Sequence, residues 1–287
     1  MHALCTSAGR LIPTLHVKRR RSQIADVLTT GSLKTYLSYP FLSRDWFNRF
    51  LVGTVLLFAC FIIPLLPAIF VYGYFVRILR RAIHGEPLTL PDWSNAGELF
   101  TDGLRSLGIG AIYLGPGSIV TVGGWLAYFL LWFSFVEAID KSGPGRPPPE
   151  QTIWLMFGAF GILLLSMALG WLLTRAGSLP LPVALAHFAA RDKFSAAFDV
   201  WGWGAILRAD PWGFAVCWVV AFGLAGVMYM VYMVIYFTVV LCFLAYFILT
   251  PMMFYIMAVS AAMFGQFYRE ALAHQPHTAP DSSSEIH

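Results

Sequence analysis

Histidine and acidic side chains carry out much of enzyme and metal chemistry, and here their spacing matches no known constellation. Of the seven histidines, only His84 and His187 lie away from the ends of the chain, and neither has an acidic partner at metal-ligand spacing. We expect each to be an interfacial side chain. Asp192 and Asp199 are seven residues apart on one predicted helix face, but both have basic neighbours, so we interpret them as a solvated face rather than a catalytic pair.

The cysteines are equally uninformative as reactive groups. No two of the four share a CxxC spacing, and three lie in strongly apolar runs, so we interpret them as small buried side chains: Cys5, Cys60, Cys217 and Cys242. The sequence therefore predicts no catalytic residue, no metal site and no cofactor.

One positive cluster remains as a candidate site. Arg77, Arg80 and Arg81 follow an apolar run directly, and Arg77 and Arg81 share a helix face. Such a cluster at a membrane boundary can hold an anionic lipid headgroup. The alternative interpretation is a topology signal, since basic residues mark cytoplasmic loops.

The composition places these residues in a membrane protein. The chain has 287 residues, of which 58% are apolar and only 12% charged, and the mean hydropathy is +0.69. A soluble fold of this size could not bury so much apolar surface. The net charge of +4 is too small for nucleic-acid binding, and the run Lys18–Arg21 lacks interleaved aromatic residues.

Four apolar blocks are long enough to cross a bilayer as helices, a crossing that needs about 20 residues. The fourth is too long for one span, so we expect it to turn near Val240–Tyr246. No ionisable side chain lies in the core of any block, which argues against proton-driven or voltage-sensing mechanisms. The blocks are Phe50–Val76, Leu107–Val136, Ile153–Thr174 and Trp212–Tyr268.

The first block has two interpretations, because Pro64 and Pro67 lie in its middle. A single span divides the basic residues about equally between the two sides of the membrane. A re-entrant hairpin turning at the prolines places 17 on one side and leaves only Lys141 and Arg146 on the other. That asymmetry is typical of cytoplasmic loops and favours the hairpin. Half-helices that end inside the membrane, however, expose carbonyl groups that the protein must satisfy.

Two further segments have the pattern of amphipathic interfacial helices. In Pro180–Arg208, aromatic residues recur at helical spacing opposite polar ones, and Asp92–Arg105 has a possible cap at Ser94 or Asn95. The glycines of the second, third and fourth blocks predict close helix–helix contact. We divide the chain into a flexible basic tail at 1–35, a transmembrane domain at 36–272 and a disordered tail at 273–287.

Several motifs together resemble one family. Over about residues 36–272 the chain is similar to a bacterial and archaeal multi-pass membrane family, the domain of unknown function numbered 4013. The resemblance implies a multi-pass membrane protein and supplies no activity, cofactor or catalytic residue. It is carried by Gly73–Arg81, Leu90–Trp93, Glu98–Phe100, Asp102–Leu104, Ala189–Asp199 and Phe264–Ala271.

The predicted fold is an all-α polytopic transmembrane bundle with four full spans, a proline-turned hairpin or fifth span, and amphipathic interfacial helices. We expect it in the cell membrane, with the N-terminal tail and basic loops cytoplasmic. Its expected partners are the phospholipid bilayer, anionic lipid, and another membrane protein or a second copy, with no nucleic acid.

Three functional classes remain. The favoured one is a non-enzymatic scaffold or accessory subunit that organises lipid or a membrane complex. The alternative is a permease or channel for an apolar or lipid-like solute, built on helix breaks at Pro64, Pro67, Gly115–Gly117 and Pro251. A membrane enzyme acting on a phosphate-bearing lipid has the least support.

Overall fold

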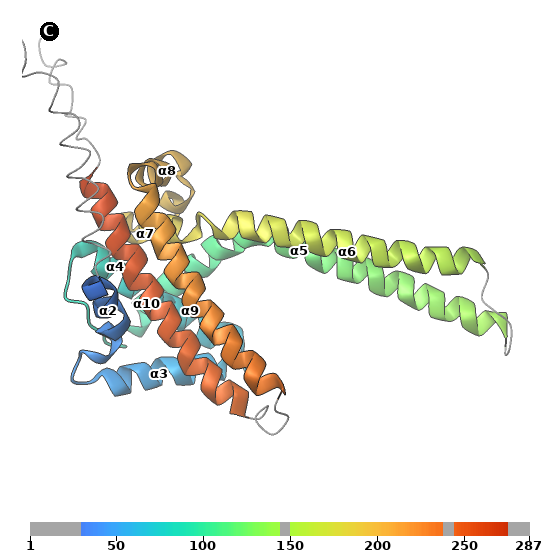
Figure 1. Ribbon diagram of the computed structural model, residues 1–287, viewed down its shortest axis with the longest axis horizontal. Helices are drawn as coiled ribbons and strands as arrows, with labels where there is room; N and C mark the ends of the chain where they lie inside the picture. Colours follow the sequence, from blue (N-terminus) through green and yellow to red (C-terminus); the bar gives the residue numbers. More distant parts are fainter. Residues whose placement is uncertain (1–29, 144–149, 238–243, 275–287) are drawn as a thin grey trace, which may run out of the picture. The chain divides into compact units, whose positions relative to one another are not determined.

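The computed structural model describes residues 30–143, 150–237 and 244–274, and within these ranges it contains helices and no strands (Figure 1). The predicted all-α fold is confirmed. The chain forms two compact units, one built from residues up to 103 together with those from 200 onward, and one from residues 104–199.

Within the described ranges, four helices are long and apolar enough to cross a membrane. They are α5 (Ala96–Ser142), α6 (Glu150–Ser178), α9 (Pro211–Phe237) and α10 (Ala245–Ala273). The predicted division of the fourth block into two helices is confirmed, since α9 ends at Phe237 and α10 begins at Ala245. Most of the turn predicted at Val240–Tyr246 lies outside the described residues.

The block Phe50–Val76 does not form one continuous helix. Four residues separate the end of helix α3 (Trp46–Ala59) from Pro64, and α4 (Leu65–His84) begins directly after that proline. Gly85 ends α4 in the left-handed conformation, with φ 73°, which glycine adopts without a steric penalty. The block therefore forms two helices with a turn at residues 60–64 between them.

Both predicted interfacial helices need correction. Asp92–Arg105 is not a separate helix, because α5 begins at Ala96 and continues into the apolar block. Pro180–Arg208 divides into α7 (Leu181–Arg191), the 3₁₀ helix η2 (Phe194–Phe198) and α8 (Val200–Ala209). Asp192 ends α7 in the left-handed conformation, so the aromatic residues that suggested one amphipathic face lie in different elements.

Helix α10 forms the centre of the first unit. It packs against α3, α4 and α9, and its C-terminal half is buried on several sides (Figure 1). Gly265 allows α4 to come close, because a methyl group there would lie 2.8 Å from the Leu79 carbonyl oxygen. On α9, the Cys217 thiol faces the Met263 carbonyl at 3.9 Å.

A short N-terminal region also packs on α10. Helix α2 (Thr30–Ser38) is followed by the 3₁₀ helix η1 (Tyr39–Phe41), and the Tyr39 hydroxyl donates a hydrogen bond of 2.9 Å to the Ala258 carbonyl. Burial raises the pKa of Tyr36 to about 12, with Glu270 adding to the rise, so this hydroxyl stays protonated at neutral pH. The predicted domain boundary at residue 36 falls inside α2, and residues 1–29 and 275–287 lie outside the described part.

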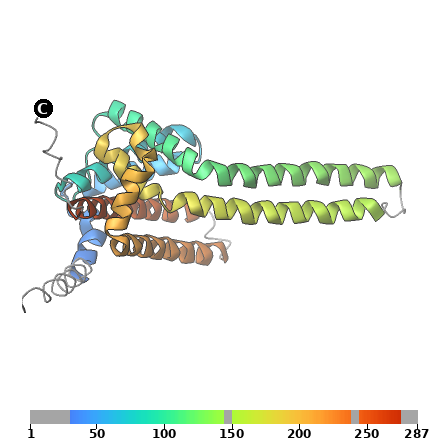
Figure 2. The ribbon, with the colours of Figure 1, turned by 90° about the horizontal axis from the view of Figure 1, so that it is seen from above.

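In the second unit, α5 and α6 form an antiparallel hairpin joined by a seam of small residues (Figure 2). A methyl group on Gly117 would lie 2.6 Å from the Gly170 carbonyl oxygen, and one on Gly170 would lie 2.8 Å from the Gly117 carbonyl. The close contact expected from the glycines is confirmed at these positions, whereas Gly123 and Gly158 face open space. The seam pairs Tyr113 with Gly177, Gly117 with Gly170 and Thr174, and Gly124 with Ser166.

This register indicates where the bilayer meets the hairpin. It brings Gly115 level with Arg175 and Glu137 level with Ile153, and neither helix carries a charged residue between these levels. Each helix contributes about 22 residues there, or about 33 Å at 1.5 Å per residue. A hydrocarbon core is about 30 Å thick, so we expect its edges at these two levels. The Arg175 guanidinium lies 5.3 Å from the Trp171 ring centroid, a pair suited to an interface.

Candidate functional site

The three arginines predicted as a site lie on the last two turns of α4, and Arg77 is bonded to the segment that follows that helix. Its Nη1 donates hydrogen bonds to the carbonyl oxygens of Asp92, at 2.8 Å, and Ser94, at 2.7 Å. Its Nη2 lies 3.2 Å from a Glu98 carboxylate oxygen. Arg77 therefore holds the chain that enters α5.

Arg80 and Arg81 also have carboxylate partners. Arg80 Nη1 lies 2.8 Å from Asp102 Oδ2 and 3.7 Å from Glu98 Oε1, and Asp102 is only 6% exposed. Arg81 Nε lies 2.6 Å from Glu86 Oε2, close to the surface. Glu98 and Asp102 both reach α4 because they stand one turn apart on the same face of α5.

Arg49 at the start of α3 belongs to the same cluster, although the sequence did not single it out. Its Nη2 lies 2.5 Å from Asp92 Oδ1, and its Nη1 donates to the Leu90 carbonyl. The Trp93 indole N–H returns a hydrogen bond of 2.8 Å to the Arg49 carbonyl. The motif Leu90–Trp93 was the available signal, because it places an acid and an aromatic residue directly after a proline.

Tyr74 completes the contacts around this segment. Its hydroxyl donates a hydrogen bond of 2.8 Å to the Pro91 carbonyl, and its ring stacks on Trp93 with centroids 3.9 Å apart and planes 7° apart. We call this set the arginine clasp; it comprises Arg49, Tyr74, Arg77, Arg80 and Arg81, with the partners Glu86, Leu90–Ser94, Glu98 and Asp102.

The arginine clasp is suited to holding helices together rather than to catalysis. Its cations are guanidinium groups, which stay protonated and do not act as bases. Its carboxylates face those guanidinium groups. Among the described residues, no three histidine, cysteine, aspartate or glutamate side chains are grouped as metal ligands would be. The clasp therefore fixes α3, α4 and the start of α5 to one loop.

A second polar cluster lies in the other unit and corrects two expectations. His187 is 2% exposed and lies in the core rather than at an interface, with Nε2 3.8 Å from Asp199 Oδ2. Arg191 Nη1 lies 3.2 Å from the same oxygen. Asp199 follows η2 and Asp192 ends α7, so they do not form one solvated helix face. His84 is exposed, with Nδ1 2.7 Å from the Arg80 carbonyl oxygen.

Headgroup binding at Arg77, Arg80 and Arg81 stays a prediction, now with a sharper test. Each basic residue near an anionic surface contributes about 1 kcal/mol, so the double variant Arg77→Ala/Arg81→Ala is expected to lower co-purified anionic lipid by roughly 30-fold. The measurement is mass spectrometry of lipid bound to the purified protein.

Glu86→Gln is the matched variant for that experiment. It removes the carboxylate that competes for Arg81 while leaving the arginine in place, so bound anionic lipid should increase. Unchanged lipid in both variants would contradict headgroup binding and leave the arginines with the clasp alone.

Comparison with known proteins gives one family match and no activity. The family model described as "Protein of unknown function (DUF4013)" matches residues 56–237, which include α4, α5, α6 and α9. No curated protein and no solved structure matches the chain.

Proposed function

The chain belongs to the DUF4013 family, and from that premise we propose that it is a non-enzymatic membrane scaffold or accessory subunit that contacts other membrane components through its apolar helix faces. The observation that carries this proposal is that charged and apolar side chains make different kinds of contact. The arginine clasp uses its charged groups for internal contacts, while α5, α6 and α9 direct most of their large apolar side chains outward.

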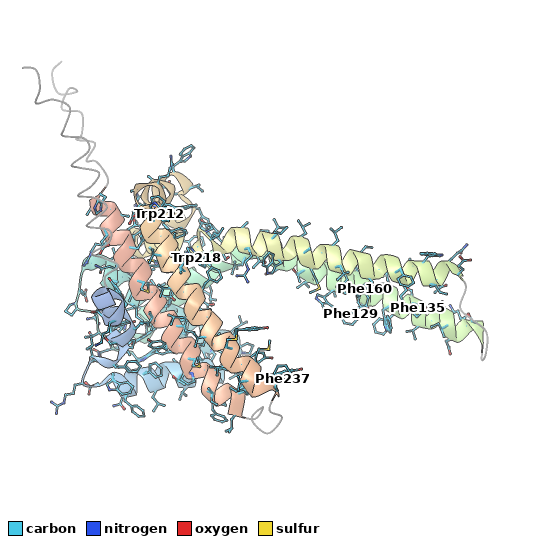
Figure 3. All side chains as sticks on the ribbon, viewed as in Figure 1. Phe129, Phe135, Phe160, Trp212, Trp218 and Phe237 are labelled. Atoms are coloured by element: carbon cyan, nitrogen blue, oxygen red, sulfur yellow. The ribbon has the colours of Figure 1, made fainter. Side chains whose placement is uncertain are left out.

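The α5–α6 hairpin illustrates the outward surface. Only 6% of the most apolar stretch of α5 is buried, and the same share applies to α9. Figure 3 shows Phe129, Phe135 and Phe160 projecting from the hairpin. The side chains of Phe129 and Phe160 are about half exposed. Lipid or another membrane protein must cover these rings, because water does not solvate them.

Two observations disfavour the alternative of a permease or channel. The glycine seam brings the backbones of α5 and α6 into direct contact, which leaves no room for a solute between them. Pro116 and Pro251 lie inside continuous helices, so neither proline marks the unwound backbone segment that a broken-helix solute site would use. Among the proposed breaks, only Pro64 stands at a helix end.

The test combines site-specific crosslinking with a flux assay. A photoreactive phenylalanine at position 129 or 160 should give a discrete crosslinked protein of stoichiometric yield after purification in mild detergent. The same residue at position 163, where Leu163 is buried between the helices, is the control and should give none. Proteoliposomes should show no more solute flux than empty vesicles.

Two outcomes contradict the proposal. A saturable flux of an apolar solute would favour a permease. Recovery of a single chain, with only lipid crosslinked at positions 129 and 160, would remove the scaffold function.

A further inference from the structure

We propose that α3, the turn at residues 60–64 and α4 form a re-entrant hairpin that enters the bilayer from the side on which Asp92 lies and turns back among the acyl chains. The proposal concerns the membrane path of this segment and does not depend on the scaffold function. Five features of the described residues support it.

The first feature is the shared base of the hairpin. Arg49, near the start of α3, lies 2.5 Å from the Asp92 carboxylate, and Arg77, near the end of α4, donates to the Asp92 carbonyl at 2.8 Å. Two side chains that touch one residue lie on one side of a hydrocarbon core about 30 Å thick. The entry to α3 and the exit from α4 are therefore on the same side.

The second feature is the path of the two helices along α10. Phe50 of α3 contacts Phe254, with centroids 5.2 Å apart, and Phe61 after α3 contacts Tyr246, with centroids 3.9 Å apart. On α4, Tyr74 is again near Phe254, at 5.8 Å. The chain thus runs toward the N-terminal end of α10 and returns to its starting level.

The third feature is the length of α3. Its 14 residues extend about 21 Å at 1.5 Å per residue, which is less than the hydrocarbon thickness. An apolar helix of this length is typical of a re-entrant segment and is too short for a perpendicular span.

The fourth feature is the composition of the tip. Ile62 is 78% exposed and Leu65 is 73% exposed. Residues 61–71 contain no polar side chain, so the segment offers nothing to an aqueous phase on the far side. A loop that emerged into water would expose this apolar surface at a cost of about 25 cal/mol for each Å². Acyl chains are the occupant that matches it.

The fifth feature is the hydrogen bonding of the backbone at the end of α3. It answers the objection that a helix ending inside the membrane exposes carbonyl groups. The carbonyl oxygens at the end of α3 accept hydrogen bonds from the turn itself: Cys60 N–H donates to Leu56 and Leu57, Phe61 N–H to Phe58, and both Ile62 N–H and Ile63 N–H to Ala59. The end of α3 is therefore satisfied within the segment, as hydrocarbon requires.

The prolines reduce the same problem at the start of α4. A helix begins with four N–H groups that lack intrahelical acceptors. Pro64 is the N-cap of α4 and Pro67 is its third residue, and neither carries an N–H. Two of the four orphan donors are thereby removed, so a helix that starts in lipid leaves only those of Leu65 and Leu66.

The experiment measures the depth of the tip in proteoliposomes of the full chain. In a variant whose four cysteines are replaced by alanine, Ile62→Cys carries a nitroxide label whose collisions with oxygen and with a water-soluble nickel chelate are compared. We expect strong oxygen relaxation and exclusion of the nickel chelate. Leu65→Cys provides a second tip position in case the first label disturbs folding.

Sidedness is measured with a membrane-impermeant maleimide. Lys34→Cys on α2 and Ser94→Cys at the clasp should react from one side, and Lys141→Cys at the end of α5 from the other. Labelling of Lys34→Cys and Ser94→Cys from opposite sides would establish a full span and overturn the proposal, even with the nickel chelate excluded from the tip, because a full span also places Ile62 at mid-depth. Nickel access with same-side labelling would place the hairpin on the surface and overturn it as well.

Discussion

Gly73→Ala is expected to destabilise the protein by about 3 kcal/mol, because overpacking of this kind forces backbones apart. A methyl group on Gly73 would overlap the carbonyl oxygen of Leu99, so α4 and the start of α5 must separate. Gly103→Ala should have a similar effect from the other side of the same contact, since its methyl group would overlap the Ile69 carbonyl. The measurement is thermal unfolding of the purified protein in detergent.

Gly97→Ala is the matched control, because Gly97 also lies on α5 but has nothing within 4 Å of the added methyl group. Alanine is the better helix former, so this variant should gain about 0.5–1 kcal/mol. A melting temperature for Gly73→Ala equal to that of the wild type would show that α4 and α5 do not approach as described.

Asp102→Asn is expected to cost about 2 kcal/mol. The substitution keeps the shape of the side chain but removes the buried carboxylate that lies 2.8 Å from Arg80, and a buried cation without its partner is costly. The loss is smaller than for a fully buried pair because Arg80 is partly exposed and Glu98 lies 3.7 Å away. The measurement is again thermal unfolding, at neutral pH.

Glu98→Gln makes the same chemical change at an exposed position and should cost less than 1 kcal/mol. The difference between the two variants should persist in high salt, because salt screens buried pairs weakly. Equal losses in the two variants, or a difference that disappears in salt, would mean that Asp102 is solvated.

The long helices were predictable from sequence because their signal is local. An uninterrupted apolar run of the right length specifies a helix in lipid whatever its neighbours are, and the runs that became α5, α6, α9 and α10 needed no other information. The division of Phe50–Val76 was visible for a similar reason, since two prolines separated by two residues disturb any helix. The sequence did not show that Pro64 is the N-cap of α4, because that position depends on where α3 ends.

The two misplaced interfacial helices show where a local signal fails. Periodicity indicates which side of a helix is apolar but does not say whether that helix continues. Asp92–Arg105 was therefore separated from a helix to which most of it belongs. In Pro180–Arg208 the pattern crossed Asp192, which adopts a left-handed conformation that periodicity does not register.

The candidate site was predictable only in part, because its partners are distant in sequence. Arg77, Arg80 and Arg81 stood out by their spacing, whereas Arg49 looks like an ordinary basic residue until the fold brings it to Asp92, 43 positions later. His187 was taken for an interfacial side chain because its acid, Asp199, follows a helix end and a 3₁₀ turn rather than lying one turn away.

The length of the charge-free part of the α5–α6 hairpin has a consequence for where the protein can reside. Its glycine seam makes the two helices one stiff unit, so neither can shorten its apolar length independently. At about 33 Å this unit matches a thick bilayer and exceeds a thin one of about 27 Å. In the thin bilayer the whole hairpin must tilt or stretch the surrounding lipids, and this hydrophobic mismatch would sort the protein toward thicker regions of the membrane.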